Sequence, residues 1–274
     1  MNFDQALQLI SQTDTFDMPT GWGQGRTVFG GFVAALLMAR AQSILGDADR
    51  KPLSASFTFV GPVQYQISKI TVETLRVGGS VTTLEARLWQ NDQVQTIMVA
   101  SFGKARQSAV SIDALPSIPN FAERSTLVKM PYVKEMIPEC FQHYDLYWAE
   151  GSMPFQAGAS ADFGGWFRFK PEVSQMAMQA PHLIALADIW PPGVTAVCRT
   201  ASPANSLTWH LTFIGDDKLE SNVLKSNVLK SNAWLQYREH TEFAQHGYAT
   251  EQAQIWDDAG NLLLLSRQTV TVFA

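Results

Sequence analysis

Apolar and polar residues along the first half of the chain follow two periods, which predict helices and then strands. Apolar side chains recur at helical spacing over residues 3–11 and again from about 31 to 45, and Gly46 suits a left-handed C-terminal cap. From Leu53 to Phe59 the period changes to two, which predicts a strand with one buried face. Further strands are expected at about 66–77, 81–91 and 93–103. A long helix followed by such a meander predicts an antiparallel sheet wrapped around a central helix.

The second half of the chain repeats this order of elements. Trp166–Phe169 is expected to be a strand, and a helix is expected to run from Pro181 through Trp190. Pro191-Pro192 ends that helix, because a proline pushes the preceding residue out of the helical region. Four strands then follow, one around Trp209 and the others at about 233–244, 248–257 and 262–273. The aromatic segment 126–160 is expected to be irregular.

Short identical patterns support a duplication. Thr58-Phe59-Val60-Gly61 returns 154 residues later as Thr212-Phe213-Ile214-Gly215, and Leu88-Trp89 returns 167 residues later as Ile255-Trp256. The extra residues of the second copy must lie between these markers, where Ser221–Lys225 is repeated at once as Ser226–Lys230. We therefore expect an N-terminal domain over residues 1–107, a linker over 108–125 and a C-terminal domain over 126–274.

Composition narrows the class of protein. Of the 274 residues 46% are hydrophobic and 16% charged, with a net charge of −5, which indicates a well-buried globular chain without the basic clusters that nucleic acids need. The two cysteines, Cys140 and Cys198, suggest neither a disulfide framework nor a metal site. The first residues lack the basic start of a secretion signal, and no apolar stretch is long enough to span a bilayer. A cytoplasmic location without a membrane span is expected.

Polar residues that differ between the two halves are the candidates for chemistry. Asp188 lies near the end of an apolar helix, where its low helix propensity, the helix dipole and desolvation all oppose it. The first helix has no acid at the corresponding place. Gln268 in the last strand aligns with Ala100 of the first half. The alternative is that both side chains face solvent.

Two weaker signals accompany these residues. Gly30 and Gly31 open the first long helix, where free backbone N–H groups can bind an anion, although they can equally allow tight packing. Ser202 and Ser206 flank a turn before the Trp209 strand and can be plain turn residues. Phosphate-binding loops, nucleophile elbows and metal-binding helix motifs are absent from the sequence.

The ordered set of motifs resembles the acyl-CoA thioesterase II family. The similarity is carried in the first half by Phe29-Gly30-Gly31 and Phe57–Pro62, and in the second by Leu186-Ala187-Asp188, Ser206–His210 and Ser266-Arg267-Gln268. It covers most of the chain and implies an α+β fold of two tandem hotdog domains, a double hotdog, each with a central helix wrapped by an antiparallel sheet.

The resemblance also implies site residues. The family's acid falls on Asp188, its amide on Gln268 and its hydroxyl on Ser202, with Ser206 as the second choice because the sequence around Ser202 departs from the family pattern. These three would hold one water that Asp188 activates to hydrolyse a fatty acyl-CoA, with no metal or cofactor. Gly30 and Gly31 would bind the substrate, and the amide of Gly31 is the candidate to polarise the thioester carbonyl.

Other functions remain open on the sequence alone. A hotdog dehydratase needs a histidine paired with an acid at the helix, which neither helix offers, since His182 stands at the very start of the second one. A non-catalytic acyl-CoA binding protein would follow if the hydroxyl cannot reach Asp188. A purely structural module is a third possibility. Because hotdog proteins commonly associate through sheet edges, a homodimer is expected.

Overall fold

The computed structural model describes residues 1–214 and 229–274. Helix α1 spans Phe3–Gln12, and helix α2, Gly30–Leu45, is buried over most of its surface and closes on Gly46 in the left-handed conformation, as predicted. Helix α3 spans Ala180–Ala187 and is buried along its whole length. In the described residues, no helix has both the length and the apolar character that crossing a membrane requires.

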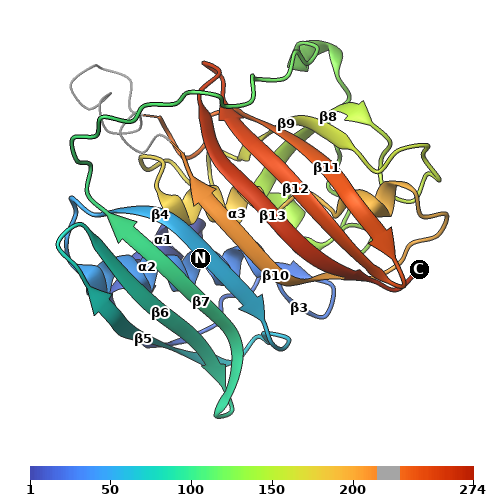
Figure 1. Ribbon diagram of the computed structural model, residues 1–274. Coiled ribbons are helices and arrows are strands. Elements are labelled where there is room, and N and C mark those ends of the chain that lie inside the picture. The colour runs from blue at the N-terminus through green and yellow to red at the C-terminus, as the bar shows by residue number, and fades with distance from the viewer. Residues whose placement is uncertain (215–228) are drawn as a thin grey trace.

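Eleven of the described strands form one antiparallel sheet, with α2 and α3 on one face of it (Figure 1). The strand order is β1 (Thr15–Asp17), β5 (Ile67–Val77), β6 (Val81–Gln90), β7 (Gln93–Gly103), β4 (Lys51–Phe59), β10 (Ala204–Phe213), β13 (Leu262–Val272), β12 (Tyr248–Asp257), β11 (Leu235–Gln245), β9 (Phe163–Phe169) and β8 (Tyr144–Gly151). A short hairpin, β2 (Gly23–Gln24) and β3 (Thr27–Val28), precedes α2.

The two halves of the chain join where β4 pairs with β10 (Figure 1). Ser56 and His210, which are 154 residues apart like the repeated motifs, lie opposite each other, and Ser56 Oγ is 2.8 Å from His210 Nδ1. Each strand therefore presents the same positions to the other, as subunits do across a twofold axis. Below this seam α2 packs against α3, and the larger of two hydrophobic clusters runs through both halves.

Two expectations from the sequence were wrong, and a third concerns residues that lie mostly outside the described part of the chain. The helix expected through Trp190 ends at Ala187, because Ile189 and Trp190 turn into the core instead of continuing it. The segment expected to be irregular contains the edge strand β8. The repeated Ser221–Lys230 segment lies outside the described residues except for Leu229 and Lys230.

The segment between β7 and the short 3₁₀ helix η1 (Arg124–Thr126) packs on the outer face of the second half. Trp256 Nε1 donates to the Pro116 carbonyl at 3.1 Å, and Trp166 Nε1 donates to the Ala122 carbonyl at 3.1 Å. The Arg124 guanidinium lies 4.6 Å from the centre of the Trp166 ring. The part from Pro116 to Arg124 is therefore docked on the sheet although it forms no strand, whereas residues 104–115 are exposed.

Candidate active site

Asp188 is the residue that caps the C-terminal end of α3, and its carboxyl group faces the beginning of α2. Its own helix dipole disfavours a negative charge there, but the N-terminal end of α2 favours one. The hydrogen bonds to this carboxyl group come from both halves of the chain, because the Gly31 amide of the first half donates to it. The two packed helices therefore supply the acid from one half and its donor from the other.

The close approach of Asp188 to α2 depends on glycine. A Cβ atom added at Gly30 would lie 3.0 Å from Asp188 Oδ2. One added at Gly31 would lie 2.7 Å from Asp188 Cβ and 2.7 Å from the Phe29 ring. The Gly-Gly pair thus lets the acid reach the helix terminus. Gly31, expected to polarise a thioester carbonyl, donates instead to Asp188.

The sheet supplies an amide that contacts the same carboxyl group and a hydroxyl that contacts this amide. Gln268 on β13 donates from Nε2 to Asp188 Oδ1 at 3.0 Å. Ser206 on β10 donates from Oγ to Gln268 Oε1 at 3.3 Å. The structure therefore brings Asp188 and Gln268 together, and it adds Ser206 to them.

Ser202 lies outside this group of side chains. Its hydroxyl donates to the Thr200 carbonyl at 3.0 Å, in the turn before β10. A β-bulge explains why Ser206 takes the position: β10 pairs Ser206 with Val270 but Thr208 with Thr269, which leaves Leu207 as an extra residue. Ser206 consequently shares the inner sheet face with Trp209, where strict alternation would have turned it outward.

Burial changes the pKa of the Asp188 carboxyl group. Although the residue keeps some exposed surface, its carboxyl group is enclosed by protein, and this desolvation raises the pKa of Asp188 from 3.8 to about 7. The hydrogen bonds from Gln268 and Gly31 act in the opposite direction, because they favour the charged form. A carboxyl group with a pKa near neutrality can accept a proton at physiological pH, as a general base must.

A second acidic cluster lies on the neighbouring strands, and sequence reasoning missed it. Glu239 on β11 and Glu251 on β12 are only 4% and 3% exposed, and their side chains are hydrogen-bonded to each other. Tyr237 donates to Glu239 Oε2 at 2.6 Å. Acids in strands usually face solvent; the one available signal was that Tyr237, Glu239 and Thr241 share a face.

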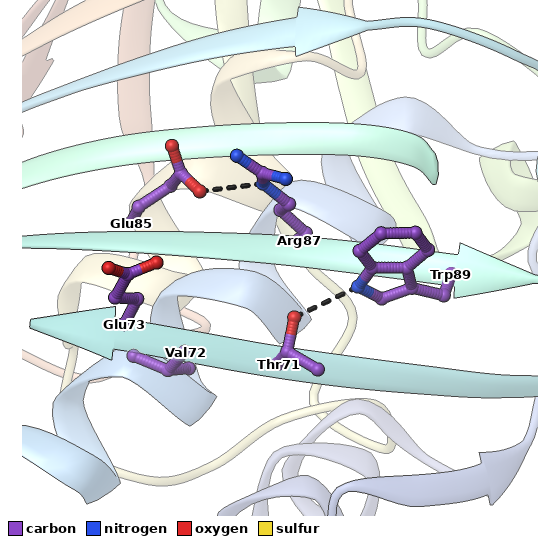
Figure 2. Close-up of a pocket in the computed structure, with 6 residues that line it drawn as sticks. All are labelled: Thr71, Val72, Glu73, Glu85, Arg87 and Trp89. Carbon is purple, nitrogen blue, oxygen red and sulfur yellow. Dashed lines mark hydrogen bonds and ion pairs between the residues drawn. The ribbon is translucent and has the colours of Figure 1, made fainter. Parts of the chain in front are cut away.

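A surface hollow of about 210 Å³ lies elsewhere, on β5 and β6 (Figure 2). Glu85 and Arg87 form an ion pair across it at 2.6 Å, and Trp89 Nε1 donates to Thr71 Oγ1 at 2.9 Å. Glu85, Arg87 and Trp89 alternate along β6 with the buried Leu84, Ala86 and Leu88. The hollow therefore opens on the outer face of the sheet, away from the helices. Among the residues with described positions, no three His, Cys, Asp or Glu side chains form a metal-ligand set.

Comparison with known proteins places this geometry in a family. The family models for the acyl-CoA thioesterase N-terminal and C-terminal domains match residues 18–103 and 113–272. A hot dog fold protein of unknown function from Alicyclobacillus acidocaldarius is 21% identical with a TM-score of 0.79, covering 95% of this chain and 92% of that one. An acyl-CoA thioesterase II from Mycobacterium marinum is 20% identical with a TM-score of 0.68, covering 89% of each chain. Comparison with curated protein sequences gives no match.

These neighbours confirm the expected α+β double hotdog fold, and the two family models together account for nearly the whole sheet and all of the residues gathered around Asp188. Their order along the chain is also that of the duplication found in the sequence. The chain therefore belongs to the acyl-CoA thioesterase family.

Proposed function

We propose that this protein hydrolyses fatty acyl-CoA to a free fatty acid and CoA, with Asp188 as the general base. The observation that carries the proposal is the enclosed Asp188 carboxyl group held by Gln268 at 3.0 Å and by the Gly31 amide. Family membership supports thioester hydrolysis as the reaction class. The arrangement fixes the base before substrate arrives, which lowers the entropic cost of reaching the transition state.

The reaction balances with water alone. Asp188 takes a proton from water while the water oxygen attacks the thioester carbonyl carbon. The tetrahedral intermediate collapses with cleavage of the C–S bond, and the proton held by Asp188 goes to the departing CoA sulfur. Gln268 keeps the carboxylate oriented, and Ser206 keeps Gln268 oriented while its oxygen lone pairs can accept a hydrogen bond from the water.

The N-terminal end of α2 is the candidate to stabilise the oxyanion. First-turn amides of a helix lack intrahelical acceptors, and since Gly31 serves Asp188, we assign this role to the neighbouring amide of Gly30. The Phe59 ring lies 3.4 Å from the position of a Cβ at Gly30 and would form an apolar wall for the acyl chain.

The test is CoA release from a panel of acyl-CoAs of increasing chain length, followed by a free-thiol reagent. Asp188→Asn should lower kcat by a factor on the order of 10² to 10⁴, the usual contribution of a general base. Asp92→Asn, which changes an exposed turn residue, is the matched control. Normal turnover by the Asp188 variant would remove Asp188 from the mechanism, and tight binding without turnover across the panel would favour a binding protein.

A further inference from the structure

The buried Glu239–Glu251 pair is costly to desolvate, and the proposed mechanism does not use it. Both carboxyl groups are almost wholly buried, and no Lys, Arg or His of the described chain forms an ion pair with either. Burial raises the pKa of both groups, and the charge of Glu251 raises that of Glu239 further. Two carboxyl groups that are hydrogen-bonded to each other in a buried place retain one proton between them.

The remaining oxygens of the pair bind one short turn of backbone. The Gly193 amide donates to Glu239 Oε1 at 2.5 Å, and the Val194 amide donates to Glu251 Oε1 at 3.1 Å. These are the first two residues of the 3₁₀ helix η3 (Gly193–Ala196). A Cβ atom at Gly193 would collide with Glu239 Oε1 and the Ala161 carbonyl, so the turn is seated directly on the pair.

This turn lies five residues after Asp188, and the connection is rigid. Ile189 is 1% exposed, and the Trp190 ring stacks on Tyr237 with centroids 5.1 Å apart and planes 9° from parallel. Tyr237 in turn donates to Glu239. The segment from Asp188 to the turn is thus fixed to the sheet at both Trp190 and Gly193.

A second connection runs across the sheet. Glu251 on β12 lies directly opposite Gln268 on β13, and directly opposed residues of an antiparallel pair point to the same face. Gln268 is the residue that donates to Asp188. The Glu239–Glu251 pair is therefore connected to the candidate site in two ways. One is the backbone from Asp188 to Gly193, and the other is the pairing of Glu251 with Gln268 across the sheet.

We propose that Glu239 and Glu251 are positioning residues for Asp188: by holding the Gly193–Val194 turn against the sheet, they set the place of the Asp188 carboxylate relative to Gln268 and Gly31. The proposal rests on the proposed function for its kinetic readout. Titration of Asp188 gives a second readout that is independent of the proposed function. The pKa of this carboxyl group depends on hydrogen bonds from Gln268 and Gly31, which it keeps only when it is correctly placed.

The experiment compares Glu251→Met, which removes the acceptor, with Glu251→Gln, which keeps an acceptor for Val194 and one negative charge on the pair. In Glu251→Met we expect the acid limb of log kcat against pH to move up by about one pH unit, the effect of losing one hydrogen bond to a carboxylate. That shift makes kcat at pH 6 about tenfold lower, with KM little changed. Glu251→Gln should restore the wild-type midpoint.

Gln90→Met is the matched control, because Gln90 is a buried, hydrogen-bonded side chain of the first half. It should lower the melting temperature without moving the midpoint. If Glu251→Met fails to fold, Gly193→Ala is the second variant, because it displaces the turn and leaves both acids in place. It should shift the midpoint of the acid limb in the same direction. An unchanged midpoint in these variants, whatever their stability, overturns the proposal, as does a Gln variant as impaired as the Met variant.

The midpoint is also measured without turnover, from the carboxyl ¹³C shift of Asp188 in protein labelled at aspartate, with Asp188→Asn to assign the signal. Absence of CoA release from every acyl-CoA would count against the proposed function alone. A ¹³C midpoint that stays in place in the Glu251→Met and Gly193→Ala variants would count against the positioning role alone.

Discussion

Replacing Asp188 by asparagine should stabilise the protein at alkaline pH, although the residue is proposed to be essential for activity. Burial raises the pKa of Asp188 from 3.8 to about 7, so the folded state resists the loss of a proton that the unfolded chain gives up readily. Stability linked to this group is fully present below pH 3.8 and is lost as the pH rises through 7. At 1.36 kcal/mol per pH unit, the complete loss is about 4 kcal/mol.

The comparison between two pH values isolates this contribution. Part of the loss has already occurred at pH 5, so the advantage of Asp188→Asn over the wild type should grow by about 2.7 kcal/mol between pH 5 and pH 9. Other acids, including Glu239 and Glu251, titrate in both proteins and cancel. Any cost of a mismatched hydrogen bond to Gly31 is the same at both pH values.

Urea unfolding at pH 5 and pH 9, followed by tryptophan fluorescence, measures the difference. Asp92→Asn, an exposed replacement, should show the same free-energy difference from wild type at both pH values. An Asp188→Asn difference that is constant with pH, or that grows toward acid, would refute the view that this carboxylate is desolvated in the folded protein.

Three further outcomes are expected from the site geometry. Turnover should fall tenfold per pH unit below about 7 and reach a plateau above it, because only ionised Asp188 accepts a proton, as a pH–rate profile would show. Ser206→Ala should lower kcat by about tenfold, the value of one lost hydrogen bond to Gln268, while Ser202→Ala should leave kcat unchanged; equal effects would contradict the assignment. Gly31→Ala should cost about 1–3 kcal/mol of unfolding free energy by overpacking, measured by denaturation, and should abolish turnover.

Most of the fold could be predicted because local patterns agree with it. Ala55 and Phe57 are buried as the alternation along residues 53–59 predicts, and so is most of the helix after Gly30. Leu53 is the exception: it is 45% exposed, because the register of β4 shifts between Pro52 and Ser54. The end of α3 could not be predicted from the Pro191-Pro192 pair alone. Tertiary packing of Ile189 and Trp190 ends the helix at Ala187, before the point at which the prolines would end it.

The sequence predicted the types of residue in the site better than their exact positions. Asp188 and Gln268 stood out because each breaks the pattern of its element, and the structure brings them together. Ser206 was the second choice, since a bulge at Leu207 changes which face it occupies and leaves no trace in the alternation of the strand. Glu239 and Glu251 were missed because long-range packing alone buries them.

The seam between β4 and β10 has a consequence for stoichiometry. A twofold arrangement offers two equivalent locations for an active site, yet Ala100, 1% exposed, occupies in the first half the position that Gln268 occupies in the second. When the two halves are fused in one chain, only one of the two locations needs to keep catalytic residues. Small apolar residues can then pack in the other. Under the proposed function, each chain would accordingly offer one site for acyl-CoA, although its fold has two equivalent locations.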